Sequence, residues 1–387
     1  MTRIYYFTFI TVCILLVFYS YGLVDPGLKL VGSRHFFLIQ EVVKPWFFPN
    51  GKTAALFYLL FISLLYIFSF IFLRLLSKSK VHFKKILIIL FLLCLFTFPA
   101  FSNDLFGYLA YAKILVFYHE SPYTALGMDF AGDTLLKFWH WSHLPAQYGP
   151  FWIILSSFPF LLSFGNFLIG YLNFKLLSLG FYLLAVRLIY KLSADNRMDA
   201  FYFALSPLII IDILIDGHND IVMMGLALLA FYLFKKKKIL LSLIFFSLSV
   251  ATKYSTFLLL PVFCYFFYCR YRQKRISWSM VWNLSALLMT VAFLIASARY
   301  EIYSRYFIWP LTFISLGKNQ QIKTAATVFS GGLLLRFAPF LYYGDWGGNT
   351  PYIKNIITLA AAAAGFLFII GKPVEIFRLV GKLVKHK

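Results

Sequence analysis

The stretch ILIILFLLCLFTFPAF at positions 86–101, followed by SNDLFGYLAY at positions 102–111, decides the fold. Its first part is an apolar run without a charge, which is typical of a membrane-spanning helix, and Asp104 follows this run closely. Tyr108 and Tyr111 lie four and seven residues after Asp104, so a helix would place all three side chains on one face. An acid at the edge of a span is costly unless it is paired or used.

Asp104 has two interpretations from spacing alone. Ser102, Asn103 or Asp104 could cap the start of an interfacial helix. Alternatively, the carboxylate is a functional group at the membrane surface. The rest of the chain has to decide between them.

The composition predicts an all-α, polytopic membrane protein. Of the 387 residues, 61% are hydrophobic, 21% aromatic and only 13% charged, far from the balance of a soluble domain. The net charge of +22 falls in short clusters between apolar runs, so it indicates topology rather than nucleic-acid binding. The four cysteines lie in or beside apolar runs without metal-ligand spacing and are interpreted as packing residues.

Apolar runs long enough to span a membrane recur along the chain. Eight long runs occur at about 4–24, 54–76, 84–101, 166–190, 199–215, 279–298, 324–341 and 354–371, and four shorter ones at about 219–234, 239–252, 254–268 and 303–317. The first is interpreted as a helix rather than a cleaved signal, since it is long and has no small-x-small cleavage site.

The basic clusters predict which ends of these helices face the cytoplasm. They lie at 78–85, 191–197, 235–238, 270–275, 318–323 and after Lys372. If all of them are cytoplasmic, the chain crosses the membrane about twelve times, and both termini lie inside. The short apolar run 151–164 contains Pro159. If it also crossed the membrane, the basic clusters at 191–197 and 235–238 would no longer face the cytoplasm, so this run is predicted to be re-entrant or interfacial.

This topology places the segment 102–165, headed by Asp104, on the outer face. We expect three parts of the chain: N-terminal helices at 1–83, a catalytic module at 84–268 and C-terminal helices at 269–387. The expected location is a plasma or inner membrane, with the active site on the non-cytoplasmic face.

The second polar cluster is Asp216-Gly-His-Asn-Asp220, on the same predicted face. Asn219 or Asp220 could simply cap the next helix in a hydrophilic hairpin. Two acids, an amide and an imidazole are more than a hairpin needs, which favours a site containing His218, Asn219 and Asp220. Because no second histidine stands at ligand spacing, we expect no metal there, although the acids leave one open.

Three cations on or near this face, Lys253, Arg299 and Arg305, form a candidate anion site. The plain alternative is that they extend along the membrane interface. Aromatic and imidazole side chains accompany them: Trp139, Trp141, His143 and Tyr148. These residues form either an aromatic belt at the level of the lipid head groups or a platform for a sugar or a polyprenyl acceptor.

Four blocks in order carry a resemblance to a known family. They are Asn103-Asp104 with Tyr108, Tyr111 and Ser121-Pro-Tyr123; Gln147-Tyr-Gly-Pro150; Gly217-His-Asn-Asp220; and Thr252-Lys253-Tyr254 before Leu260-Pro261. The chain resembles the GT-C superfamily of multi-pass glycosyltransferases, and within it the mannosyltransferases that use polyprenol-phosphate-mannose. The family often has paired acids at the first block, whereas this chain has Asn103-Asp104.

The resemblance implies an inverting transfer of a sugar, mannose by analogy, from a polyprenyl-phosphate donor to a glycan or glycolipid acceptor. Asp104 would be the catalytic base, and Lys253, Arg305 and Arg299 would bind the donor phosphate. Sugar or acceptor contacts would come from Tyr108, Tyr111, Tyr148, His218, Asn219, Asp220, Trp139, Trp141 and His143. No metal, cofactor or nucleotide would be needed, and the other partners would be membrane lipids.

Two rival functions fit the same apolar pattern. A flippase or transporter of lipid-linked glycans would also bury polar groups, but here they lie in predicted outer loops rather than at mid-membrane. An O-antigen-type polymerase or ligase also has many spans and one large outer loop, but that loop usually comes late and relies on arginine and histidine.

Overall fold

The computed structural model describes residues 2–31, 34–78 and 80–370, so the basic tail after Lys372 lies outside the described residues. The described part is all-helical and contains no strand, which confirms the all-α part of the predicted fold class. The α-helices are α1 Thr2–Tyr21, α2 Arg34–Phe47, α3 Gly51–Ser77, α4 Phe83–Leu95, α5 Asp104–Val116, α6 Thr134–Phe138, α7 Pro150–Leu161, α8 Phe167–Leu192, α9 Arg197–Ala204, α10 Pro207–Ile209, α11 Asp220–Lys235, α12 Ile239–Thr252, α13 Leu260–Tyr271, α14 Trp278–Arg299, α15 Ile308–Leu316, α16 Gln320–Leu335, α17 Ala338–Tyr343 and α18 Thr350–Ile370. Tighter or wider helical turns occur at Pro26–Val31, Gly127–Asp129, Ile210–Ile215, Tyr254–Leu259 and Ser304–Phe307.

Six helical segments among the described residues are long and apolar enough to cross a membrane, which supports a multi-pass membrane protein. They are Arg3–Tyr21, Gly51–Ser77, Phe167–Leu192, Trp278–Arg299, Gln320–Tyr343 and Thr350–Ile370. A seventh is added if Arg197–Ala204 and Pro207–Ile215, which meet at a bend of 49°, are one broken span. The bend has a local cause, since Pro207 supplies no backbone donor to continue the first helix.

The predicted number of about twelve spans is not confirmed by helix length. The apolar run 84–101 forms a helix only as far as Leu95, and the four shorter runs become helices of 16, 14, 12 and 9 residues. Two of those are preceded by a separate tight turn. The run predicted to be re-entrant forms α7, a helix of 12 residues with Pro159 inside it.

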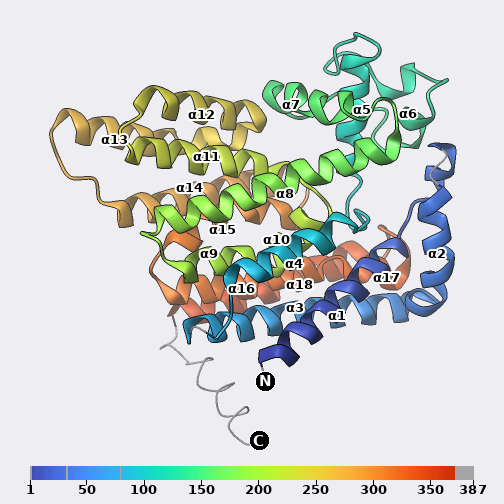
Figure 1. Ribbon diagram of the computed structural model, residues 1–387, viewed down its shortest axis with the longest axis horizontal. Helices are drawn as coiled ribbons and strands as arrows, with labels where there is room; N and C mark the ends of the chain where they lie inside the picture. The colour runs from blue at the N-terminus through green and yellow to red at the C-terminus, as the bar shows by residue number, and fades with distance from the viewer. Residues whose placement is uncertain (1, 32–33, 79, 371–387) are drawn as a thin grey trace, which may run out of the picture.

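The centre of the molecule is formed by helices that are buried on nearly every side. α15 is buried along its whole length, and α11 is buried from Asp220 to Leu228. α11 packs against α8 and α12, and α8 runs diagonally across the bundle in Figure 1. In contrast, α18 exposes much of its apolar surface, as expected of a helix that faces lipid.

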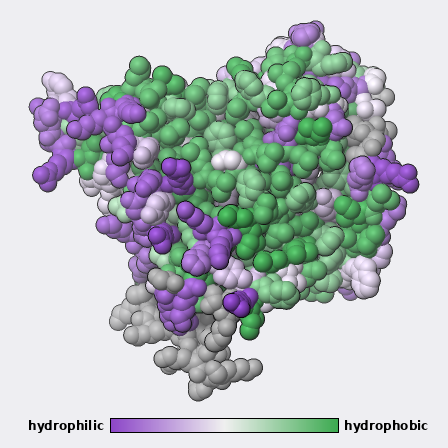
Figure 2. Space-filling view, in the orientation of Figure 1, coloured by the Kyte–Doolittle hydropathy of each residue, from purple (hydrophilic) through white to green (hydrophobic). Residues whose placement is uncertain are grey.

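The segment 102–165 forms a cap at one end of the bundle, where α5, α6 and α7 gather at the upper right of Figure 1. Asp133 holds this cap together: its carboxylate accepts a hydrogen bond from Tyr118 at 2.8 Å and lies 2.5 Å from the ammonium of Lys113. In Figure 2 a broad hydrophobic area covers the middle of the face, and hydrophilic residues gather mainly at the left and lower left. That arrangement matches a bundle with an apolar belt.

Candidate active site

Asp104 is the first residue of α5, and its side chain does not cap the helix. Asn103 occupies the cap position without a side-chain bond to the helix, while the Ser102 hydroxyl accepts a hydrogen bond from the Asp104 backbone at 3.2 Å. Capping therefore does not explain why this position is an aspartate. The carboxylate instead points toward two side chains from other parts of the chain.

Those partners are His218 and Arg305. The Asp104 Oδ2 atom lies 3.3 Å from His218 Nδ1 and 3.5 Å from Arg305 Nη2. Burial acts to raise the pKa of Asp104, but Arg305 and His218 outweigh it and hold this pKa well below its usual value. Burial and the nearby Arg305 also lower the pKa of His218, so its ring is neutral at neutral pH. Asp104 is thus an ionised carboxylate beside one fixed cation.

The turn that carries His218 is built by the local sequence. Residues Ile210–Ile215 form a π-helical turn, a feature that is frequent at functional sites. Gly217 follows with φ of +75°, a left-handed conformation that side chains rarely adopt. The Asn219 backbone then donates to the Tyr108 hydroxyl at 3.3 Å, which ties this turn to α5. Among the described residues, neither polar atom of the fully buried Asn219 amide has a hydrogen-bond partner, which is unusual for a buried amide.

Asp220 and Lys253 form the second charged pair of the site. The Asp220 Oδ1 atom accepts hydrogen bonds from Lys253 Nζ at 2.8 Å and from Trp309 Nε1 at 2.6 Å. Asp220 is fully buried, and its other oxygen has no hydrogen-bond partner among the described residues. The positive charge of Lys253 and the hydrogen bond from the Trp309 indole offset the cost of burying the Asp220 carboxylate.

An aromatic cradle holds the two cations. The Lys253 ammonium lies over the rings of Tyr306 at 4.9 Å and Trp309 at 5.4 Å. The Arg305 guanidinium lies over Tyr303 at 4.2 Å and over Tyr306 at 5.4 Å. Tyr306 therefore touches both cations, and these contacts bring the C-terminal part of the chain into the site.

Gly149 links the sequence block Gln147-Tyr-Gly-Pro150 to the block Thr252-Lys253-Tyr254. Its backbone donates to the Thr252 carbonyl at 3.1 Å. A Cβ atom at this position would lie 2.1 Å from the carbonyl oxygen of Ala251, so only glycine allows this approach. The contact places the cap directly beside the backbone that presents Lys253.

Sequence reasoning missed part of the site. Asp212 and Lys175 lie inside the apolar runs 199–215 and 166–190, and neither was predicted to be a site residue. Lys175 donates to the carbonyls of Leu214 and Ile215 and to the Thr97 hydroxyl, and Asp212 accepts from Ser304 at 2.9 Å. The usable signal was the presence of an ionisable residue within a span, which marks functional sites.

One group of buried side chains has the composition of a metal site. Asp212, Asp216 and His218 each offer a ligand atom, and these atoms lie within 4.8 Å of one another. Two of the three are already engaged by protein donors: Asp212 accepts from Ser304, and Asp216 accepts from the Phe101 backbone at 3.0 Å. The cluster is thus compatible with a small cation but does not require one.

The predicted aromatic residues divide into two groups. Tyr108 packs edge-on against Tyr148 at 5.1 Å, and Tyr111 packs edge-on against Trp139 at 4.6 Å, so these four lie between α5 and the rest of the cap. Among the described residues, three predicted site residues share no hydrogen bond, ion pair or ring contact with the cluster around Asp104: Trp141, His143 and Arg299. Arg299 lies over the Tyr300 ring instead.

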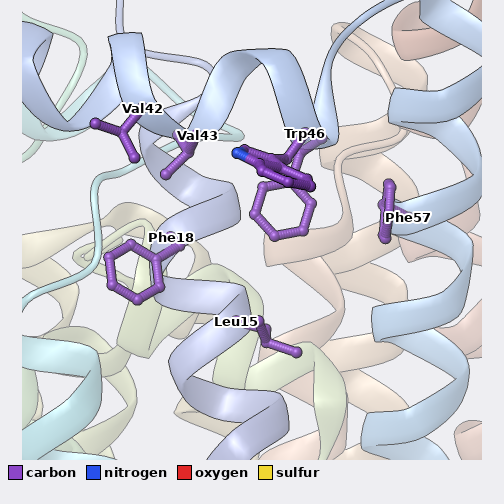
Figure 3. Close-up of a pocket in the computed structure, with 7 residues that line it drawn as sticks. Leu15, Phe18, Val42, Val43, Trp46 and Phe57 are labelled. Carbon is purple, nitrogen blue, oxygen red and sulfur yellow. The ribbon is translucent and has the colours of Figure 1, made fainter.

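An apolar pocket of about 380 Å³ lies elsewhere, between α1, α2 and α3. Figure 3 shows Phe18, Trp46 and Phe57 converging on it. None of the predicted site residues lines this pocket, and its walls are apolar. It therefore offers no group that could carry the chemistry of Asp104 and its neighbours.

Comparison with protein families gives one match. Residues 14–268 match the family described as alpha-(1->6)-mannopyranosyltransferase, N-terminal domain, which is more than half of the chain. Comparison with curated proteins and with solved structures gives no match. The family match confirms the predicted resemblance to membrane mannosyltransferases, and its range contains Asp104, His218, Asp220 and Lys253. The chain belongs to the alpha-(1->6)-mannopyranosyltransferase family.

Proposed function

We propose that this membrane mannosyltransferase takes its sugar from a polyprenyl-phosphate donor and transfers it, with inversion, to a hydroxyl of a glycan or glycolipid acceptor on the non-cytoplasmic face. The observation that carries the proposal is the placement of Asp104 3.5 Å from Arg305, beside a second cation-bearing pair formed by Lys253 and Asp220. A base next to a phosphate-binding cation is what this reaction needs.

Asp104 acts as the general base. Its carboxylate accepts the proton of the acceptor hydroxyl while that oxygen attacks the anomeric carbon from the face opposite the donor phosphate. The bond between the anomeric carbon and the phosphate oxygen breaks in the same displacement, and the sugar is therefore transferred with inversion. General-base assistance of this kind contributes about 10²–10⁴-fold to the rate.

Arg305 and Lys253 bind the donor phosphate and stabilise the charge of the departing polyprenyl phosphate. Both cations sit against the cradle of Tyr303, Tyr306 and Trp309, which fixes their positions before the substrate arrives. Since these two side chains provide the positive charge, the reaction needs no metal ion. Asn219, whose buried amide has no hydrogen-bond partner among the described residues, binds hydroxyl groups of the mannosyl residue.

Donor binding also activates the base. In the free protein Arg305 holds the pKa of Asp104 well below its usual value, which makes the carboxylate a weak base. A phosphate that draws the Arg305 guanidinium toward itself removes this effect, and burial then raises the pKa of Asp104. Asp104 becomes basic only when the donor is in place.

The test uses purified protein with a synthetic polyprenyl-phosphate-mannose and candidate acceptors. Asp104→Asn should lower transfer by about 10²–10⁴-fold. Glu120→Gln is the matched control, because Glu120 is an exposed carboxylate in the same outer segment, and it should transfer at the wild-type rate. Undiminished transfer by folded Asp104→Asn would refute the base assignment. Movement of lipid-linked sugar across a bilayer without transfer would refute the proposed reaction.

A further inference from the structure

A hollow of about 450 Å³ lies where α4 begins, beside the last turns of α8 and the start of α9. Its floor is apolar and includes Leu87, Leu183 and Val186, while three cations line its rim: Lys84, Arg187 and Arg197. The side chains of these three cations are exposed. The hollow is thus amphipathic, with positive charge above an apolar surface.

The rim cations have no acidic partner within the described part of the chain. The two acids at this end of α8 and α9 are already paired: Asp195 lies 2.7 Å from Lys191, and Asp199 lies 2.5 Å from Lys323. No carboxylate of the part of the chain that the structure describes lines the hollow. Its positive charge is therefore available to an anion from outside the protein.

The position of the hollow indicates which anion fits. Arg187 belongs to the last turns of a candidate span and Lys84 to the first turn of α4, so the hollow opens where a span meets the membrane surface. Basic side chains at the ends of membrane spans are common because they determine which end faces the cytoplasm, and they do not by themselves indicate a binding site. Here, however, cations from three separate helices converge on one hollow that is also lined by apolar side chains.

We propose that this hollow binds an anionic phospholipid, with the phosphate head group at Lys84, Arg187 and Arg197 and an acyl chain along Leu87, Leu183 and Val186. Basic pockets between spanning helices are suited to such head groups. Free phosphate would leave the apolar floor uncovered, which is why a lipid is the expected ligand. The site contains none of the residues proposed for mannosyl transfer, so each proposal can be refuted without affecting the other.

The experiment places the purified protein in phosphatidylcholine nanodiscs and titrates in phosphatidylglycerol. Bound lipid is counted by native mass spectrometry, and the melting temperature is recorded. We expect retained phosphatidylglycerol and a higher melting temperature in the wild type. The triple variant Lys84→Gln/Arg187→Gln/Arg197→Gln should bind it about 100-fold more weakly, from roughly a fivefold loss for each cation.

The matched control Lys236→Gln/Lys237→Gln/Lys238→Gln removes the same charge from a basic cluster outside the hollow and should bind like the wild type. Equal weakening in both triple variants would overturn the proposal, because it would mean that net charge alone attracts the lipid. Inorganic phosphate that displaces the lipid as effectively as a short-chain phosphatidylglycerol would overturn it too. Arg187→Gln alone, with an expected loss of about fivefold, provides the same test if the triple variant does not fold.

Discussion

Replacing Arg305 with glutamine should change the pH dependence of mannosyl transfer, not only its rate. In the wild type, burial acts to raise the pKa of Asp104, but Arg305 and His218 keep it well below its usual value. The carboxylate therefore stays ionised as the pH falls through the ordinary aspartate pKa of about 4. In Arg305→Gln, burial is no longer opposed by this cation. The pKa of Asp104 rises, and the base is lost by protonation at a higher pH.

The size of this shift follows from one distance. Two unit charges 3.5 Å apart, as between Arg305 and Asp104, interact with about 5 kcal/mol at an effective dielectric constant of about 20. That energy corresponds to about 3.5 pKa units. Because the two side chains are still 17% and 12% exposed, part of the interaction is screened by water, and we expect an observed shift of about 2 units.

Two measurements follow the protonation of Asp104. The first is kcat/KM for mannosyl transfer as a function of pH, which reports the free enzyme. The second is the pH dependence of labelling by a hydrophobic carbodiimide, which reacts with the protonated carboxyl and needs no donor. Arg305→Gln should show an acid limb about 2 units above that of the wild type in both. Arg299→Gln is the matched control, because that arginine lies over Tyr300 rather than beside Asp104.

Superimposable profiles for the wild type and Arg305→Gln would refute the electrostatic argument, since Asp104 would then titrate independently of its nearest cation. A uniform loss of rate at every pH would contradict it as well, because Arg305 would then bind the donor without governing the base. The labelling experiment separates these cases even if transfer by Arg305→Gln is too slow to follow.

Three further changes test other parts of the site. Lys175→Met should lower the free energy of unfolding by about 3 kcal/mol, because two backbone carbonyls and the Thr97 hydroxyl lose a buried donor. The melting temperature should fall, and an unchanged melting temperature would contradict this role of Lys175. Gly149→Ala should weaken donor binding by displacing the backbone before Lys253, whereas wild-type affinity would show that this approach is not needed. Exhaustive treatment with a chelator should leave mannosyl transfer unchanged; loss of transfer restored by a divalent cation would instead assign Asp212, Asp216 and His218 to a metal.

Several residues of the candidate site could be singled out from the sequence because charge is scarce in this chain. Asp104, His218, Asp220 and Lys253 stand out as polar groups between apolar runs, and the structure brings all four together with Arg305. Arg299 looked equivalent to Arg305 in the sequence, but only a three-dimensional contact separates them. Arg305 follows the end of α14 and turns inward over Tyr303, while Arg299 remains on the last turn of that helix.

The number of spans was harder to predict, for a physical reason. Hydropathy reports that a segment avoids water, but it does not distinguish a helix surrounded by lipid from one surrounded by other helices. α15 has only nine residues, all buried, and no length rule applies to a helix that lipid does not contact. The π-helical turn at Ile210–Ile215 likewise reflects tertiary contacts, since Asp212 and Asp216 are held there by Ser304 and the Phe101 backbone.

The pairing of Asp104 with Arg305 also makes donor affinity depend on the base. If the donor phosphate raises the pKa of Asp104 by drawing Arg305 away, then by reciprocity neutralising Asp104 must strengthen donor binding. Asp104→Asn should therefore transfer mannose about 10²–10⁴-fold more slowly yet bind polyprenyl-phosphate-mannose more tightly than the wild type, by up to about 100-fold if the coupling equals 2 pKa units. Calorimetric titration without acceptor measures this directly. An unchanged or weaker affinity would mean that phosphate and carboxylate do not compete for Arg305, and activation of the base by the donor would have to be abandoned.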